Sequence, residues 1–120
     1  MSGAGGTGGT GGMGGMMGGG TAWRAVTTNS APTARVGHSA VWSGSEVIVW
    51  GGRDASGAAL PTGGRYDPAL DRWVTMSVID AAEPRSEQRT CWAGDQMLVT
   101  GGDGANPMTP PARGGRYKPQ

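Results

Sequence analysis

Few side chains in this 120-residue sequence are of the types that perform chemistry. The single cysteine, Cys91, excludes an internal disulfide and cannot build a zinc site. Asp67 and Asp71 are the nearest to a carboxylate pair for acid–base work, but they flank an Asp-Pro turn and we expect them to cap it. We therefore predict no catalytic residues, no metal site and no cofactor.

The other polar candidates occupy repeated positions, which favours structural roles. The single histidine, His38, is replaced by Gln88 one repeat later, so we expect it to make a structural hydrogen bond. Cys91 occupies the place of a valine in the first repeat, and we expect it to be buried as a small apolar residue. Arg35 and Arg85 could bind an anion, but their equivalent positions favour hydrogen bonds within the fold.

The chain repeats itself with a period of 50 residues. Seven residues recur at that shift, namely Trp23, Arg35, Trp42, Gly44, Val49, Gly51 and Gly52, which return as Trp73, Arg85, Trp92, Gly94, Val99, Gly101 and Gly102. The sequence GGRY occurs at 63–66 and again at 114–117, a shift of 51. A period near 50 is typical of units that cannot each bury their apolar face alone.

Each repeat has the pattern of four short strands. In the first copy we predict a hairpin from a strand after Arg35 and a strand at 46–50, then strands at 64–66 and 72–76. In the second copy we predict strands at 89–92 and 96–100, followed by the second GGRY. The apolar run VIVW at 47–50 predicts a strand covered on both faces. No helical apolar period appears, so the fold class is all-β.

These landmarks resemble the kelch repeat. The resemblance rests on Arg35 opening the first strand, Gly51-Gly52 ending the second, Tyr66-Asp67 in the third and Trp73 in the fourth. The first copy is similar to the bacterial form of the motif. The resemblance implies a partial kelch β-propeller in the galactose oxidase-like superfamily, made of about two four-stranded antiparallel blades. We expect a blade at 35–76, an incomplete blade at 85–120 and a strand of a preceding blade at 22–26.

Residues 1–22 form a different kind of segment. They contain twelve glycines, four methionines and no charged residue, which predicts a flexible Gly/Met-rich linker. No signal peptide is visible, and no run approaches the roughly 20 apolar residues of a membrane span. A net charge of +1 gives no electrostatic case for a nucleic-acid partner. We expect a full-length parent protein to be secreted or to lie at the cell surface.

Two explanations of the incomplete second blade remain open. Propellers close with roughly four to eight blades, more than this chain supplies. The chain is then either a fragment of a longer propeller protein or a homo-oligomeric unit whose copies form a ring. In a ring, the strand at 22–26 supplies the missing fourth strand of the incomplete blade.

The loops carry the predicted binding function. The longest are 53–62 and 103–112, followed by 77–84, and their polar side chains provide the candidate binding residues Arg53, Asp54, Asp103 and Asn106. We expect a kelch-repeat binding module for protein or carbohydrate, without catalysis of its own. The alternatives are part of a sugar oxidase or mutarotase whose site lies on blades absent here, or a chain with no independent function.

Overall fold

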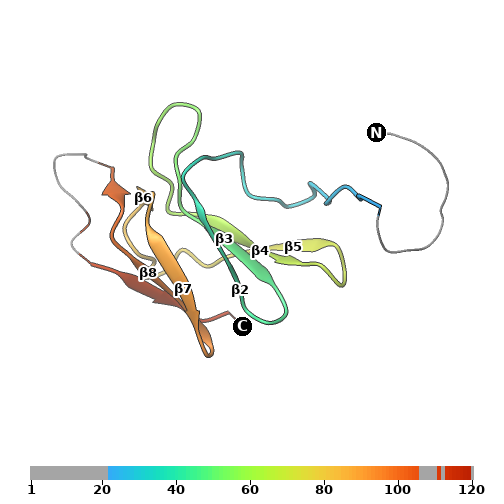
Figure 1. Ribbon diagram of the computed structural model, residues 1–120. Helices are drawn as coiled ribbons and strands as arrows, with labels where there is room; N and C mark the ends of the chain where they lie inside the picture. Colours follow the sequence, from blue (N-terminus) through green and yellow to red (C-terminus); the bar gives the residue numbers. More distant parts are fainter. Residues whose placement is uncertain (1–21, 106–110, 112, 120) are drawn as a thin grey trace.

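The computed structural model describes residues 22–105, 111 and 113–119, and within them the chain is all-β, with no helix. The described strands are β2 (Ser39–Trp42), β3 (Val47–Trp50), β4 (Gly63–Asp67), β5 (Arg72–Thr75), β6 (Arg85–Ser86), β7 (Arg89–Ala93), β8 (Gln96–Thr100), β9 (Asp103–Gly104) and β10 (Gly115–Tyr117). Figure 1 shows the two larger sheets next to one another. The predicted linker at 1–22 lies outside the described residues, apart from Ala22.

The first sheet has four antiparallel strands in the order β2-β3-β4-β5. The β2–β3 hairpin closes at Ser43, whose hydroxyl accepts a hydrogen bond from the backbone N–H of Glu46 at 3.0 Å. The first strand starts at Ser39, later than predicted, because Gly37 takes a φ of +71° and bends the chain before it. Four antiparallel strands over this part of the chain were predicted, and they are confirmed.

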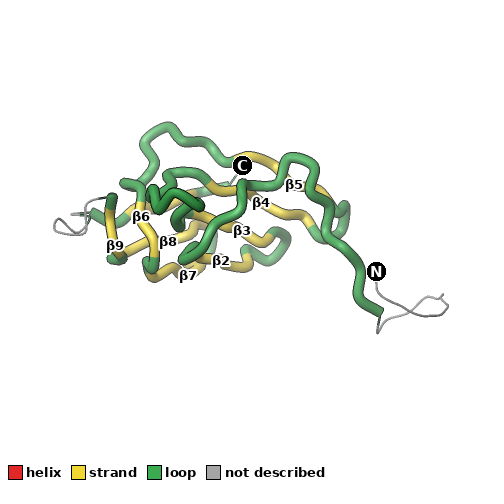
Figure 2. Tube along the Cα trace, turned by 90° about the horizontal axis from the view of Figure 1, so that it is seen from above, coloured by secondary structure: helices red, strands yellow, loops and turns green. Residues whose placement is uncertain are grey.

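The second sheet has three strands in the order β10-β8-β7, and its register repeats that of the first. Val99 faces Gly115 across β8 and β10, as Val49 faces Gly64 across β3 and β4. A small third sheet, β6-β9, pairs Ser86 with Asp103. The sequence analysis did not predict this pair. Figure 2 shows β6 and β9 at the end of the molecule far from the described N-terminal segment.

The core lies between the two larger sheets. Its buried residues are Ile48 and Trp50 of β3 and Met97 and Val99 of β8. In β3 these alternate with half-buried Val47 and Val49, so one face of the strand is fully covered and the other only in part. The prediction that VIVW is covered on both faces is therefore only partly right. With four buried apolar side chains, neither sheet has a core without the other.

The two sheets meet through backbone at glycines. Gly52 N–H donates to the carbonyl of Arg85 at 2.8 Å, and Glu87 N–H donates to the carbonyl of Gly37 at 2.8 Å. Gln88 donates its amide N–H to the Trp50 carbonyl at 3.0 Å and to the Ser39 hydroxyl at 2.9 Å. This close approach requires the absence of side chains on the glycines and allows the sheets to share hydrogen bonds.

Both repeated arginines bind carbonyl groups inside the fold, as predicted. Arg85 is 0% exposed and donates to the carbonyls of Gly101 and Arg113. Arg35 donates to the carbonyls of Gly51 at 3.0 Å and Thr62 at 2.6 Å. Burial lowers the pKa of both guanidinium groups. Each arginine thus links the backbone just after the second strand of its repeat to the backbone just before the third strand.

Three expectations for single positions are wrong. Cys91 is exposed, because alternate residues of β7 point away from the core and it lies on the outer face. His38 is also exposed and has no hydrogen-bond partner among the described residues. Its counterpart Gln88 contacts the first sheet, whereas no described sheet lies beside His38 in the same way. Residues 22–26 do not form a strand, and Trp23 is 100% exposed, because no described strand lies beside them.

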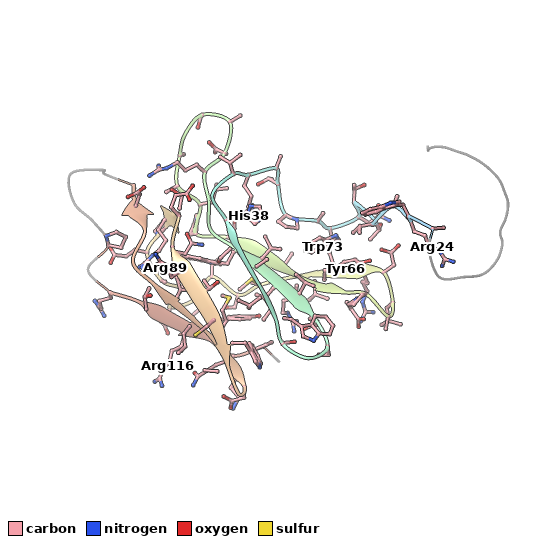
Figure 3. The ribbon with its side chains drawn as sticks, in the orientation of Figure 1. Arg24, His38, Tyr66, Trp73, Arg89 and Arg116 are labelled. Atoms are coloured by element: carbon pink, nitrogen blue, oxygen red, sulfur yellow. The ribbon has the colours of Figure 1, made fainter. Side chains whose placement is uncertain are left out.

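The outer edge of the first sheet holds the N-terminal segment. Trp73 packs on Tyr66 with ring centroids 5.1 Å apart, and its indole N–H donates to the Thr27 carbonyl at 3.0 Å. Asp71 accepts hydrogen bonds from the Tyr66 hydroxyl at 2.7 Å and from the Thr27 N–H at 3.1 Å. Figure 3 shows Tyr66 and Trp73 together on this edge. The chain at Thr27 is therefore fixed beside β5.

Replacing Gly51 with alanine should destabilise the fold more than replacing Gly57 with alanine. Both glycines have positive φ, which costs alanine about 1–2 kcal/mol. A Cβ at Gly51 would also lie 2.9 Å from the Arg85 carbonyl oxygen and 2.7 Å from the Gln88 amide nitrogen, whereas Gly57 has open space. The collision adds about 1–3 kcal/mol. Urea unfolding of the two variants measures the difference, and equal midpoints would contradict the close approach of the sheets.

Replacing Asp71 with asparagine should lower the pKa of Tyr66. The hydrogen bond to Asp71 raises that pKa, and the same bond lowers the pKa of the Asp71 carboxyl. The chain has two tyrosines, so an ultraviolet absorbance titration should show one of them shifting to lower pH. The wild type loses the stabilisation by Asp71 as the pH falls through the lowered carboxyl pKa, and the variant lacks it at every pH. The Asp95→Asn variant is the control, and a D71N titration identical to the wild type would contradict the contact.

Candidate binding groove

An open groove lies between the two larger sheets at the end where both hairpins turn. Its volume is about 520 Å³, within the usual range of small-molecule sites. The hairpin turns at 43–46 and 93–96, which Figure 1 shows at the same end of the two sheets, supply lining residues to it. Its lining residues are Ser43, Ser45, Glu46, Arg65, Asp67, Trp92, Gly94, Asp95, Lys118 and Pro119. The groove thus combines an aromatic side chain with charges of both signs.

Trp92 is the aromatic side chain of the groove. It lies near the end of β7, where the strand enters its hairpin turn, and it is half-buried against the core cluster. Its indole N–H donates to the Gly94 carbonyl at 3.1 Å. Because this bond and the core contact hold the ring, the groove has a preformed apolar surface.

Two ion pairs supply the charges. Arg65 and Glu46 lie 3.1 Å apart on the first sheet, with 13% and 17% of their side chains exposed. Lys118 and Asp95 lie 3.2 Å apart on the second sheet and are 68% and 64% exposed. The exposed pair contributes little to stability, because water screens it. Its charged groups are therefore available to a ligand at small cost to the fold.

The two sides of the groove are electrostatically linked. Burial raises the pKa of the Tyr117 hydroxyl, the Arg65 guanidinium acts to lower that pKa, and the Glu46 carboxylate acts to raise it. Tyr117 belongs to the second sheet, whereas the ion pair that acts on its pKa belongs to the first. The packing of the sheets, and not either repeat alone, creates this polar surface.

Asp67 has a structural task at the rim of the groove. Its carboxylate accepts hydrogen bonds from the N–H groups of Ala69 at 2.9 Å and Leu70 at 3.2 Å, which closes the turn between β4 and β5. This is the capping role that we predicted for it. Ser43 closes the β2–β3 hairpin in the same way. The rim of the groove is held by turn hydrogen bonds of its own.

Of the predicted binding residues, the three that the structure describes, Arg53, Asp54 and Asp103, lie at the opposite end of the sheets. Arg53 donates to the carbonyls of Gly57 at 2.9 Å and Gly104 at 2.8 Å, so it holds the loop at 53–62 against β9. The Asp54 carboxylate accepts from the hydroxyl and N–H of Ser56 and from the N–H of Ala58, and these bonds, the hydroxyl first, lower its pKa. Both side chains thus have structural partners within the loop.

The structure brings only part of the predicted loop set together. Through its bond to Gly104, Arg53 lies next to Asp103, which is exposed at the start of β9. Asn106 lies outside the described residues. Binding through these four residues stays a prediction.

The groove at the hairpin end was not predicted from the sequence, although each repeat has a turn there, Ser-Gly-Ser next to Trp42 and Ala-Gly-Asp next to Trp92.

Two other features, a metal-binding group of side chains and a membrane-spanning helix, are absent from the described part of the chain. No group of three or more His, Cys, Asp or Glu side chains there is placed to hold a metal ion. It also contains no helix of the length and apolar character needed to cross a bilayer.

Comparison with known proteins adds no relative. No protein-family model matches the chain, and no curated protein is significantly similar to it.

Proposed function

We propose that this chain is a kelch-like repeat module that binds carbohydrate in the groove between its sheets, without catalysis of its own. The observation that carries the proposal is the groove of about 520 Å³ that places Trp92 beside exposed Asp95 and Lys118. Sugars present flat apolar C–H faces and a rim of hydroxyl groups. An aromatic ring can cover such a face while carboxylate and ammonium groups bond the hydroxyls.

The kelch-like part of the proposal has separate support. Two successive antiparallel sheets repeat the same strand register at the spacing of the sequence repeat. Two of the landmarks, the arginine and the second glycine of the double glycine, have the same roles in both repeats. The repeated arginines bind carbonyls after the second strand, and Gly52 and Gly102 lie against the chain before the first. Such blades are parts of a propeller, whose loops and inter-blade surfaces commonly hold ligands.

Carbohydrate is favoured over protein because of the size of the groove. A stable protein partner buries roughly 800 Å² on each side, usually around aromatic and arginine anchors. Here the guanidinium of Arg65 is already paired with Glu46 and mostly covered. The groove offers one aromatic surface with polar groups around it, which matches a small polar ligand better than an extended protein face.

Oligosaccharide binding should depend on the aromatic face of Trp92. We would titrate the chain with short glucose, galactose, mannose and N-acetylglucosamine oligomers and follow heat and tryptophan emission. Trp92→Leu should weaken binding at least tenfold, because it keeps an apolar side chain and removes the ring, and Trp92→Tyr should retain most of it. Circular dichroism and urea unfolding would check that each variant is folded.

A second pair of variants tests the charges without disturbing the core. Lys118→Ala should weaken the same binding several-fold, because exposed Lys118 lines the groove. Arg72→Ala removes an exposed cation from β5, outside the groove, and should leave binding unchanged. The absence of binding to every oligomer, or equal affinities of the wild type, W92L and K118A, would refute the proposal. A peptide ligand that displaces no sugar would favour the protein alternative.

A further inference from the structure

The second sheet has an unpaired edge. In the first sheet β4 is hydrogen-bonded between β3 and β5, whereas its counterpart β10 pairs only with β8 among the described strands. The N–H and C=O groups along the outer side of β10 are therefore able to bond another strand. A strand added there would complete the pattern of the first sheet.

Residues 22–26 have the properties of the strand that is lacking. They are exposed, they belong to no sheet, and Trp23 is 100% exposed. Trp23 precedes Trp73 of β5 by 50 residues, so it has the phase of a fourth strand. The bonds of Thr27 to Asp71 and Trp73 fix the chain immediately after this segment at the β5 edge. Figure 1 shows it on the side of the first sheet away from β10, so it is positioned to reach another molecule and not its own second sheet.

The surroundings of Trp73 show what Trp23 would find at β10. Trp73 faces Tyr66 across β4 and β5, covers Gly64, and bonds the Thr27 carbonyl. The corresponding positions in the second repeat are Tyr117, Gly115 and Ser77. These three residues line one cavity, together with Ala82 and residues of the core. The cavity thus lies where an indole from a fourth strand would pack, and its lining includes Ser77, the counterpart of the residue whose carbonyl accepts the Trp73 indole N–H.

A second, independent mismatch lies where the sheets stack. In the first repeat, a Cβ at Gly51 would meet Gln88 and the Arg85 carbonyl, both from the second repeat, just before β7. In the second repeat, a Cβ at Gly101 would meet no described residue within 4 Å, although its φ of +67° is close to the +76° of Gly51. Conversely, Gln88 bonds the Trp50 carbonyl, while its counterpart His38 is exposed and has no hydrogen-bond partner in the described part of the chain. The surface at Gly101 on the second repeat and the surface at His38 on the first are therefore each left without the neighbour that the corresponding surface has inside the chain.

We propose that the chain associates head to tail with a second copy of itself, which places His38 of one copy against Gly101 of the other and adds residues 22–26 to β10. One arrangement of two copies covers both surfaces at once, the one at His38 and residues 22–26 and the one at Gly101 and β10. The contact between the copies then repeats the contact that the two repeats of one chain already make. Such a contact joins two different surfaces, so copies form a closed ring or an open chain. This association goes beyond ligand binding and does not depend on the groove.

The first test is the mass of the purified chain in solution, measured by size-exclusion chromatography with light scattering over a series of concentrations. The wild type should elute as multiples of 12.1 kDa. Trp23→Ala should give the single mass, and it should not affect folding of one copy because Trp23 is 100% exposed. Gly101→Asn should also give the single mass, since asparagine tolerates positive φ but its side chain blocks the stacking surface.

The matched control is Gly94→Asn. Gly94 has a φ of +74° and open space around it, as Gly101 does, but it lies in a hairpin turn away from the stacking surface. This variant should keep the mass of the wild type. A monomeric wild type at every concentration would overturn the proposal and favour completion of the sheet by a further repeat of a longer parent chain. Equal masses of the wild type, W23A and G101N would overturn it as well.

The second test uses a mixture of the two variants. Trp23→Ala keeps the acceptor surface at β10 and Gly101, whereas Gly101→Asn keeps the donor segment at 22–26. Each is expected to be monomeric alone, and their mixture should give a dimer that cannot grow, with a blue shift of tryptophan emission as Trp23 of the G101N copy is buried. A mixture that stays monomeric, or a dimer formed without the shift, would refute the head-to-tail contact.

Discussion

The close approach of the two larger sheets at glycine is the constraint on which the rest of the molecule depends. Gly51 and Gly52 end a buried strand with two positive φ values, which turns the chain and leaves no side chain between the sheets. Backbone and amide groups of residues 85–88, which lead into the second sheet, enter this space and bond the first sheet. The small core of Ile48, Trp50 and their two partners on β8 then closes beside it.

The same stacking contact produces the groove. Neither hairpin end is hollow by itself, but the two sheets bring Trp92 and Lys118 of one repeat opposite Glu46 and Arg65 of the other. The turns around them are held by their own hydrogen bonds, so a ligand would meet surfaces that are already ordered. In the proposed function, the structural contacts are made by the backbone at one end of the sheets and the ligand contacts by side chains at the other.

Local patterns predicted much of this architecture because they act over a few residues. Alternating strands, the Ser43 turn, the Asp67 cap and the two arginines could all be inferred from residue type and spacing, and the structure bears them out. The failures concern residues whose surroundings come from another sheet. Cys91 depends on which face of β7 is covered, and a one-residue change of phase reverses that face, whereas His38 precedes β2 and depends on whether another sheet stacks beside it.

The sequence by itself determined that the chain is all-β, that its units repeat, and where most strands and turns lie, since backbone preferences and strand periodicity are local. Only the tertiary structure decided where those units meet. The pairing of Gly51 with Gln88, the groove at the hairpin ends, and the unmatched surfaces at His38, Gly101 and β10 all arise from contacts between distant segments. Such contacts depend on how sheets pack in three dimensions, which residue type and spacing do not specify.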